Sequence, residues 1–327
     1  MMKINAKNNI PGEEWDHHIA KLGGNILQSR AWALFQWQLG RSTYYAYGND
    51  WAYLAQLRVG RGIKYLYVAY GPVARTAEGM STAIRSLMQR GRDLGIDFLR
   101  LEPVGPIPQD LLAQYRSRAI AEIQPQRTLI LNLTKSEAGL RAGISQSNRN
   151  LINTAAQRGI RCHLVARPGD NEYDQFIAML HDTAEHDKFR PYEDNYYRQT
   201  MITLGHEGKA RLYLAYANAK LVAGAIVFDF AKTRYYAHAA AFQDLNRQYK
   251  AAAPLLWQII LEAKAQGMHY FDFWGIAPTD DPSHPRAGLT RFKRSFGGQV
   301  KQYNGAWDLP MRPAKYQLYR IAKAGLR

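Results

Sequence analysis

The first third of the chain alternates between two patterns of apolar and polar positions. Segments 51–59, 63–70 and 96–103 are short runs of apolar and aromatic residues, which is typical of β-strands. A segment from about Ser81 to Leu94 has apolar residues at helical spacing instead. The order strand, strand, helix, strand predicts an α/β fold.

The same order recurs in the second half of the chain. Strand-like runs cover 210–217, 220–230 and 233–242, a helix is expected at about 253–266, and a further strand covers 268–276. Each half therefore holds a β-hairpin followed by a helix and a strand. This repetition predicts a duplicated unit.

The connection between the halves lacks a proline-rich or serine-rich linker. A single helix is expected there, from about Ser136 to Arg158, with Gly159 as its stop. A helix shared by two units implies domains that are packed together, with a cleft between them as the natural binding site.

The excess of basic residues suggests an anionic partner. The 327 residues are 46% hydrophobic, enough for the cores of two domains, and they carry 43 Lys and Arg against 27 Asp and Glu. Residues 286–327 contain ten of these basic side chains and Asp308 as the sole acid. Such a surplus attracts polyanions, namely RNA, nucleotide diphosphates or an anionic membrane face, and a solvated surface without a partner is the alternative.

Cysteine content and terminal sequence bear on location. Cys162 has no second cysteine to pair with, as expected in a reducing compartment. The N-terminal residues lack the apolar core of a signal peptide, and apolar runs such as 221–228 are too short to span a bilayer. We expect a cytoplasmic protein, with peripheral membrane contact through the basic C-terminal segment left open.

Most familiar catalytic motifs are absent from the sequence. There is no G-x-S-x-G, no G-x-x-x-x-G-K-[ST] and no G-x-G-x-x-G. His181 and Glu185 lie one helical turn apart, but a zinc site needs three or four ligands, so no metal is expected. Segment 246–254, between the second hairpin and its helix, could direct backbone N–H groups at an anion, yet it lacks the glycines of acetyl-CoA-binding loops.

One carboxylate stands out among aromatic residues. In the strand at 268–276, alternation places Tyr270, Asp272 and Trp274 on one face. Asp272 could accept a proton or orient an amine there, while a structural role in the strand is the alternative. On the neighbouring strand, the same rule places Tyr236 and His238 on a common face as candidate substrate contacts.

The segment GLTRFKRSFGG, residues 288–298, combines basic and aromatic residues. On a helical wheel at about 100° per residue, Leu289, Phe292 and Phe296 fall within about 60° and form a packing stripe. Arg291 and Arg294 lie opposite, free to face an anion. Lys293 lies at the border of the stripe, about 40° from Leu289. A partly desolvated lysine held there can stabilise developing negative charge.

At these residues the sequence resembles the Fem family of peptidoglycan bridge-forming aminoacyltransferases, which move an aminoacyl group from aminoacyl-tRNA to an amine of a cell-wall precursor. The order and spacing of several segments together carry the resemblance over nearly the whole chain. They are 27–36, 67–74, 98–103, 125–133, the helix end from Arg149 to Gly159, 270–276 and 288–298.

The resemblance implies two acetyltransferase-like (GNAT-like) domains with mixed sheets around a cleft. It implies a first domain of residues 1–140 plus 308–327 and a second of 141–307. The coiled-coil arm of some members has no counterpart, because a strand follows Gly159. No cofactor is implied, and a monomer is expected.

The resemblance also implies roles for individual residues. Phe292 and Lys293 would position the aminoacyl-tRNA end, with Lys293 stabilising the oxyanion or the departing ribose oxygen. From the strand and helix patterns above, we also expect Asp272 as a further catalytic residue and Arg291 and Arg294 as contacts for tRNA. The candidate substrate-binding residues are Arg30, Tyr70, Arg190, Arg211, Tyr236, His238 and Trp274.

The expected function is aminoacyl transfer from aminoacyl-tRNA to UDP-MurNAc-pentapeptide or lipid II. Two alternatives remain at the level of sequence. The first is an acyl-CoA-dependent N-acyltransferase on the same fold, which the glycine-poor loop disfavours. The second is a non-catalytic module that binds tRNA or an anionic lipid headgroup through its basic surface.

Overall fold

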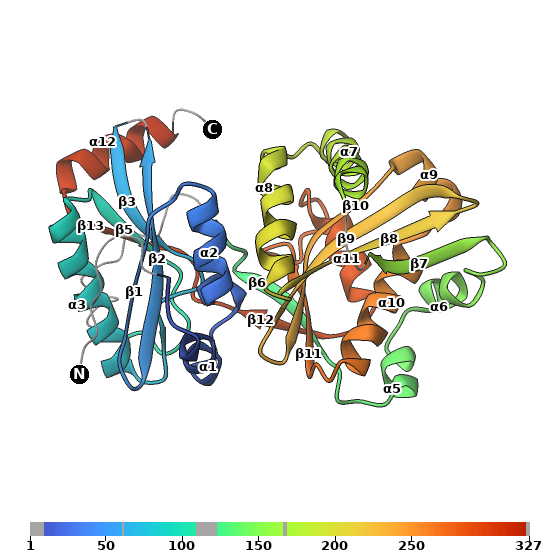
Figure 1. Cartoon of the computed structure of the whole chain (residues 1–327), viewed down its shortest axis with the longest axis horizontal. Helices are drawn as coiled ribbons and strands as arrows, with labels where there is room; N and C mark the ends of the chain where they lie inside the picture. The colour runs from blue at the N-terminus through green and yellow to red at the C-terminus, as the bar shows by residue number, and fades with distance from the viewer. Residues whose placement is uncertain (1–9, 61, 109–122, 166–168, 325–327) are drawn as a thin grey trace. The chain divides into compact units, whose positions relative to one another are not determined.

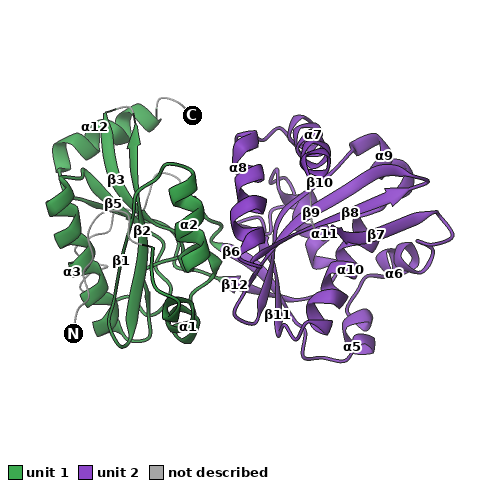
Figure 2. Ribbon diagram, viewed as in Figure 1, with its two compact units in different colours: residues 1–126, 302–327 green, residues 127–301 purple. Residues whose placement is uncertain are grey.

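The computed structural model describes residues 10–60, 62–108, 123–165 and 169–324. Its chain divides into two compact units, Met1–Gln126 with Gln302–Arg327 and Arg127–Lys301 (Figure 2). Each unit has its own mixed sheet with helices on both faces, so the predicted α/β class is confirmed (Figure 1). The expected domain limits of 140/141 and 307/308 differ from these unit limits, and the domain assignment remains a prediction.

Unit 1 contains a sheet in the order β1-β2-β3-β5-β13, with β4 paired to β2. Its strands are β1 (Thr43–Tyr47), β2 (Trp51–Gly60), β3 (Ile63–Val68), β4 (Val73–Ala74), β5 (Phe98–Leu101) and β13 (Trp307–Pro310). Its helices are α1 (Glu14–Lys21), η1 (Ile26–Gln28), α2 (Arg30–Gln38), α3 (Ala77–Leu94) and α12 (Pro313–Ala324). Strand β5 is parallel to β3, and the other neighbouring pairs are antiparallel.

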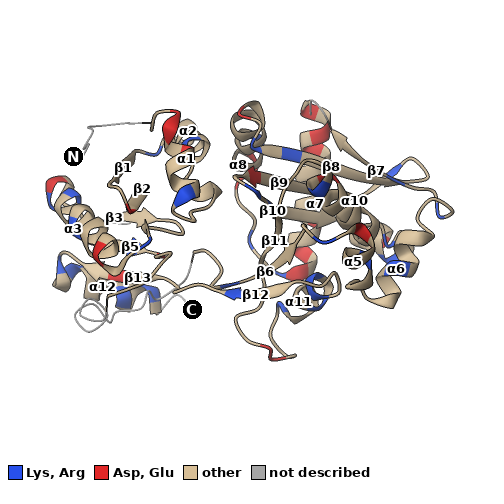
Figure 3. Ribbon diagram, turned by 90° about the horizontal axis from the view of Figure 1, so that it is seen from below, with Lys and Arg blue, Asp and Glu red and all other residues tan. Residues whose placement is uncertain are grey.

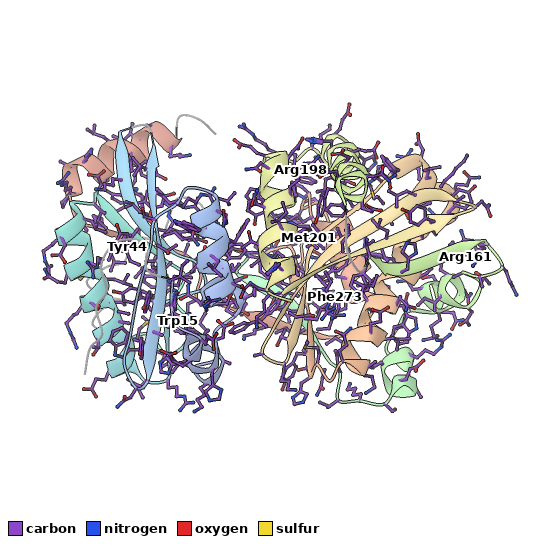
Figure 4. The ribbon with its side chains drawn as sticks, in the orientation of Figure 1. Trp15, Tyr44, Arg161, Arg198, Met201 and Phe273 are labelled. Atoms are coloured by element: carbon purple, nitrogen blue, oxygen red, sulfur yellow. The ribbon has the colours of Figure 1, made fainter. Side chains whose placement is uncertain are left out.

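Alternation along β1 shows how the two faces of this sheet are covered. Tyr44 and Ala46 belong to the core cluster that includes Met80 and Leu87 of α3. Tyr45 instead contacts the ring of Trp15 from α1, with centroids 5.2 Å apart (Trp15 and Tyr44 are labelled in Figure 4). Helices therefore cover both faces of this sheet at β1.

Unit 2 contains a sheet in the order β12-β6-β11-β10-β9-β8-β7. Its strands are β6 (Arg127–Asn132), β7 (Ile160–Val165), β8 (Ala210–Ala217), β9 (Lys220–Phe230), β10 (Thr233–Ala241), β11 (Tyr270–Gly275) and β12 (Gln299–Gln302). Its helices are α5 (Glu137–Ala142), α6 (Gln146–Asn153), α7 (Asp170–Asp187), α8 (Asp194–Gln199), η2 (Thr200–Leu204), α9 (Gln243–Tyr249), α10 (Ala252–Ala265) and α11 (Ala287–Arg294).

The repeated order predicted from the sequence is present in both units. In unit 1 the hairpin β2–β3 leads through α3 to β5, which is parallel to β3. In unit 2 the hairpin β9–β10 leads through α9 and α10 to β11, which is parallel to β10. A helix that connects parallel strands can pack back onto the sheet, so each unit is built around the same motif.

The expected helix from Ser136 to Arg158 is wrong in its continuity. Two short helices, α5 and α6, take its place, and both lie in unit 2. The break occurs because the Ser145 hydroxyl accepts a hydrogen bond from the Asn148 N–H and caps a new helix at this point. Gly159 has φ 68° and precedes β7, so the end of the segment was predicted correctly.

Candidate active site

Helix α11 carries Lys293 on its buried side. Thr290 and Lys293, three residues apart, are buried, and Phe296 is buried just beyond the helix end. Leu289 is 47% exposed, so its predicted place in the packing stripe is wrong. The reason is that α11 contacts the rest of unit 2 through Thr290, whose hydroxyl accepts a hydrogen bond from the Ala277 N–H at 2.9 Å.

Lys293 is more deeply buried than a border position predicts. Its side chain is 5% exposed, and Nζ donates a 2.7 Å hydrogen bond to the carbonyl oxygen of Gly275. The pKa of Lys293 is lowered to about 7, chiefly by burial; the charge of Asp272 opposes the shift, and that of Arg286 adds to it. The lysine can therefore exist in both protonation states near neutral pH.

Asp272 is the second buried ionisable group beside α11. It is 3% exposed, and its Oδ1 accepts a 2.8 Å hydrogen bond from the Trp274 N–H. Burial raises the pKa of Asp272 to about 6, against the opposing influence of that N–H and of the charges of Lys301 and Lys293. The carboxyl and the ammonium are thus electrostatically coupled, with pKa values that have moved toward each other.

A β-bulge connects these two groups through the backbone. Asp272 is paired with Ile130 and Gly275 with Thr128, so β11 has one residue more than β6 between these pairs. Trp274 lies in this bulge with φ 62°, and the expected alternation of Tyr270, Asp272 and Trp274 on one face ends there. As a result, the Trp274 N–H donates a hydrogen bond to Asp272, and the Gly275 carbonyl accepts one from Lys293.

Phe292 and the glycines that follow hold α11 in place. The Phe292 ring is partly buried and contacts Phe296 edge to face, with centroids 5.5 Å apart. Phe296 in turn contacts Phe273 of β11, which Figure 4 labels. At Gly298, with φ 102°, a Cβ atom would lie 3.0 Å from the carbonyl oxygen of Ile130, so glycine permits the close approach to β6.

The two arginines of α11 are exposed, as predicted. Arg294 forms a 2.7 Å ion pair with Asp280, which also pairs with Arg127 at 3.1 Å. Arg291 is exposed (Figure 3 shows the basic positions of α11 in blue). The charge of Arg294 is therefore partly neutralised by Asp280.

Tyr236 and His238 lie on opposite faces of β10, so the expectation of a common face is wrong. Tyr236 pairs with Val227 and His238 with Ile226, which leaves Ala237 as the extra residue of a bulge. Tyr236 is buried in the core beneath α10. His238 contacts the rings of Tyr192, Tyr196, Tyr197 and Phe228, and burial lowers its pKa to about 4.

The remaining candidates for substrate binding are held by local contacts. In unit 2, Arg211 forms a 2.9 Å ion pair with Asp229, and Arg190 is exposed between α7 and α8. In unit 1, the Tyr70 hydroxyl donates to the carbonyl oxygen of Pro125 at 2.7 Å. The backbone N–H of Arg30, at the start of α2, donates to Asp16.

Within the described residues, no group of three or more His, Cys, Asp or Glu side chains is arranged to hold a metal ion. His181 instead contacts Asp194 at 2.7 Å. Across the same residues, no helix is long and apolar enough to cross a membrane.

Two contributors to this site were missed at the level of sequence. Thr290 lies three residues before Lys293, a spacing that places both side chains on one helical face and could have revealed it. The Gly275 carbonyl carries no side-chain signal, although the Trp–Gly dipeptide at a strand end is a position where a bulge forms readily.

Known proteins similar to this chain share its fold. A crystal structure of FemX matches 97% of this chain and 100% of its own at a TM-score of 0.82 and 16% identity. A tandem GNAT protein from the clavulanic acid biosynthesis pathway matches 95% of this chain and 98% of its own at a TM-score of 0.57 and 14% identity. The expected GNAT-like architecture is thereby confirmed.

Sequence relatives with stated activities match a smaller share of the chain. The Lipid II:glycine glycyltransferase of Staphylococcus haemolyticus is 19% identical over 268 residues, which cover 62% of this chain and 63% of that protein. The aminoacyltransferase FemA of Staphylococcus epidermidis is 25% identical over 101 residues, or 31% of this chain and 24% of that protein. The match therefore spans less than two thirds of these relatives. The FemAB family model matches residues 113–221 and 218–324, more than half of the sequence, and the chain belongs to the FemAB family.

Proposed function

We propose that this protein is an aminoacyltransferase that moves an amino acid from aminoacyl-tRNA to an amine of a peptidoglycan precursor. The observation that carries the proposal is the buried Lys293, whose ammonium is fixed by the Gly275 carbonyl beside Asp272. Family membership and the activities named for the two staphylococcal relatives support it. The proposal includes a cytoplasmic location, where charged tRNA is available, and a monomeric protein.

The reaction needs a group that stabilises negative charge on the ester carbonyl. As the precursor amine attacks, a C–N bond forms and the carbonyl oxygen becomes an oxyanion; collapse then breaks the ester C–O bond and releases the ribose oxygen. A lysine ammonium has three N–H donors, of which Gly275 accepts one. The others can serve the oxyanion or the departing ribose oxygen, and the low polarity of a buried site strengthens this interaction.

The same reaction releases a proton from the attacking amine. Asp272 is suited to take it, because a carboxyl with a pKa of about 6 is ionised at neutral pH and more basic than an exposed aspartate. The proton can then pass to the ribose oxygen, so that the products are an amide and tRNA with a free hydroxyl. Phe292 supports Lys293 through its contact with Phe296, while Arg291 and Arg294 offer positive charge to tRNA phosphates.

The acyl-CoA alternative is disfavoured by the segment 246–254. This segment forms the end of α9 and the start of α10, and its N–H groups are used locally. The Lys250 N–H donates to the Asn246 carbonyl, and the Ala252 N–H donates to the Asn246 side chain at 3.3 Å. These N–H groups are therefore engaged rather than directed at a pyrophosphate.

A transfer assay tests the proposed function. The protein is incubated with tRNAs charged with labelled glycine, alanine, serine or lysine, and with UDP-MurNAc-pentapeptide or lipid II as acceptor. We expect a precursor heavier by one or more amino-acid residues by mass spectrometry, and no product when acetyl-CoA replaces the charged tRNA. Absence of transfer to both acceptors would refute the proposal, whereas acylation from acetyl-CoA alone would support the alternative enzyme.

A further inference from the structure

Two guanidinium groups share one carboxylate beside the candidate active site. Arg127, the first residue of β6, donates a hydrogen bond to Oδ1 of Asp280 at 3.1 Å. Arg294, the last residue of α11, donates to the same oxygen at 2.7 Å. Two positive charges therefore meet a single negative charge, and the surplus makes this place attractive to an anion that replaces the carboxylate.

The two arginines are attached to the same strand and helix as the contact of Lys293. The side chain of Arg127 is 14% exposed, and its guanidinium also donates to the Ala277 carbonyl at 3.3 Å. The Arg127 carbonyl accepts from the Ile276 N–H at 3.0 Å, one residue beyond the carbonyl that binds Lys293. Arg294 directly follows Lys293 in α11. An anion bound by both arginines would therefore lie close to the reacting groups.

Asp280 belongs to a more exposed part of the chain than Arg127. It lies in segment 278–283, which is exposed throughout and is neither helix nor strand, and its side chain is 64% exposed. Ion pairs with this exposure contribute little to stability, because water and salt compete for both charges. The carboxylate can therefore leave the guanidiniums while β6 and α11 keep the two arginines in place.

A phosphodiester group is suited to replace this carboxylate. It also carries one negative charge, and it has two non-bridging oxygens, so each guanidinium can bind an oxygen of its own. In aminoacyl-tRNA the ester is on the 3′-terminal nucleotide, and the 5′-phosphate of that nucleotide is the phosphate nearest to the reacting carbonyl. In the precursor, the muramoyl sugar and several amino-acid residues separate the diphosphate from the amine. The position beside Lys293 therefore favours the tRNA phosphate.

We propose that Arg127 and Arg294 bind the 5′-phosphate of the 3′-terminal nucleotide of aminoacyl-tRNA, and that Asp280 occupies this site until the phosphate displaces it. The proposal rests on the proposed function, since it names the part of the tRNA that this site binds. Asp280 then competes with tRNA, charged or uncharged, and returns to the guanidiniums when the product tRNA leaves.

Binding of a model RNA tests the site without transfer. The full chain is titrated with an uncharged RNA hairpin that ends in single-stranded CCA, and with the same hairpin carrying a neutral methylphosphonate at its last internucleotide linkage. We expect the wild type to bind the methylphosphonate hairpin about two- to fivefold more weakly, the range for an exposed charge pair. The double variant Arg127→Gln with Arg294→Gln should bind both hairpins equally. Arg294→Gln alone, at a side chain that is 41% exposed, should show part of this effect.

The variant Asp280→Asn separates a competitor from a structural link between α11 and its neighbours. If Asp280 competes with the phosphate, the variant should bind the unmodified hairpin about two- to fivefold more tightly than the wild type at low salt. Asp281→Asn is the matched control, because it removes the same charge from the next residue, whose carboxylate accepts from the Ser283 N–H at 2.8 Å. We expect a smaller change for this control. Circular dichroism checks that each variant is folded.

The outcomes can be distinguished from those of the transfer assay. Unchanged or weaker RNA binding by Asp280→Asn, or the same preference between the hairpins in the wild type and the double arginine variant, would overturn the proposal even where transfer occurs. A double arginine variant that loses affinity for UDP-MurNAc-pentapeptide and not for the hairpin would also overturn it and assign the site to the precursor diphosphate. The expected hairpin results without any transfer would support the phosphate site and refute the proposed reaction alone.

Discussion

The Nζ of Lys293 donates its hydrogen bond to the carbonyl oxygen of Gly275, eighteen residues earlier in the chain. Gly275 follows Trp274, whose N–H donates a hydrogen bond to the carboxylate of Asp272. The carboxylate of Asp272 therefore stabilises the bulge that presents the carbonyl to the lysine. Asp272 can influence Lys293 both through its charge and through the backbone between them.

Replacing Lys293 by methionine should remove transfer and preserve the fold. Methionine has a similar length and no charge, so the variant avoids the cost of burying an ammonium. We expect kcat to fall by about 10²- to 10³-fold, the range found when one oxyanion-stabilising donor is removed, with a melting temperature equal to or above that of the wild type. The assay is single-turnover transfer from charged tRNA, with Lys220→Met at the exposed start of β9 as the control. Wild-type turnover by Lys293→Met would exclude a catalytic role for this residue.

Two variants of Asp272 should separate its charge from its hydrogen bond. Asparagine keeps an oxygen that can accept from the Trp274 N–H, whereas alanine leaves this N–H without its partner. We expect Asp272→Asn to fold normally but transfer slowly, and Asp272→Ala to lose about 1–3 kcal/mol of unfolding free energy in addition. Denaturant unfolding and kcat are measured on both variants. If Asp272→Asn retains full activity, the residue acts through the bulge and not as a proton acceptor.

The pH dependence of transfer should reflect both groups. Ionised Asp272 is required above its pKa of about 6, and protonated Lys293 is required below its pKa of about 7. The two conditions predict a narrow optimum between these values for kcat. Asp272→Asn should remove the acidic limb and move the alkaline limb to lower pH, because the charge of Asp272 raises the pKa of Lys293. A profile of the variant that matches the wild type would contradict this assignment.

Stability should also depend on pH, and the direction follows from the lowered pKa of Lys293. Between pH 7 and 10.5 the unfolded state holds the lysine proton that the folded state has released, so the unfolding free energy of the wild type should rise with pH over this range. Lys293→Met should lack this contribution. The unfolding free energies of both proteins are measured by chemical denaturation at several pH values. Parallel plots of unfolding free energy against pH for the two proteins would show that the lysine is not desolvated in the folded state.

The order of elements in both units could be predicted because apolar periodicity is local. The strands at 210–217 and 220–230 coincide with β8 and β9, and the helix end at Gly267 follows from its left-handed backbone. The bulges at Ala237 and Trp274 could not be predicted in this way, since each depends on the register of a partner strand. They explain why His238 and Trp274 depart from period-two alternation.

The burial of Lys293 was underestimated for a related reason. A helical wheel treats α11 alone and includes Phe296, which lies beyond the helix end at Arg294. What buries the lysine is the contact of Thr290 with Ala277 and of Nζ with Gly275. Both partners are backbone groups, one at the last residue of β11 and one two residues beyond it, for which a side-chain pattern contains no signal.

The C-terminal segment should stabilise unit 1 through the buried ion pair of Arg100 and Asp308. Strand β13 pairs with β5, and the guanidinium of Arg100 donates two 2.7 Å hydrogen bonds to Asp308. The Tyr316 hydroxyl of α12 donates to the same carboxylate at 2.8 Å. Because Asp308→Ala leaves a buried guanidinium without its counter-charge, we expect it to lose about 3–5 kcal/mol of unfolding free energy.

Asp93→Ala, on the exposed side of α3, is the matched control and should change stability by less than about 0.5 kcal/mol. Double replacement of Arg100 by methionine and Asp308 by leucine should recover much of the loss, since it removes both buried charges together. The measurement is urea denaturation followed by tryptophan fluorescence, with Trp51 and Trp307 as reporters within unit 1. An Asp308→Ala protein as stable as the control would mean that the pairing of β13 with β5 holds the C-terminal segment without help from the ion pair.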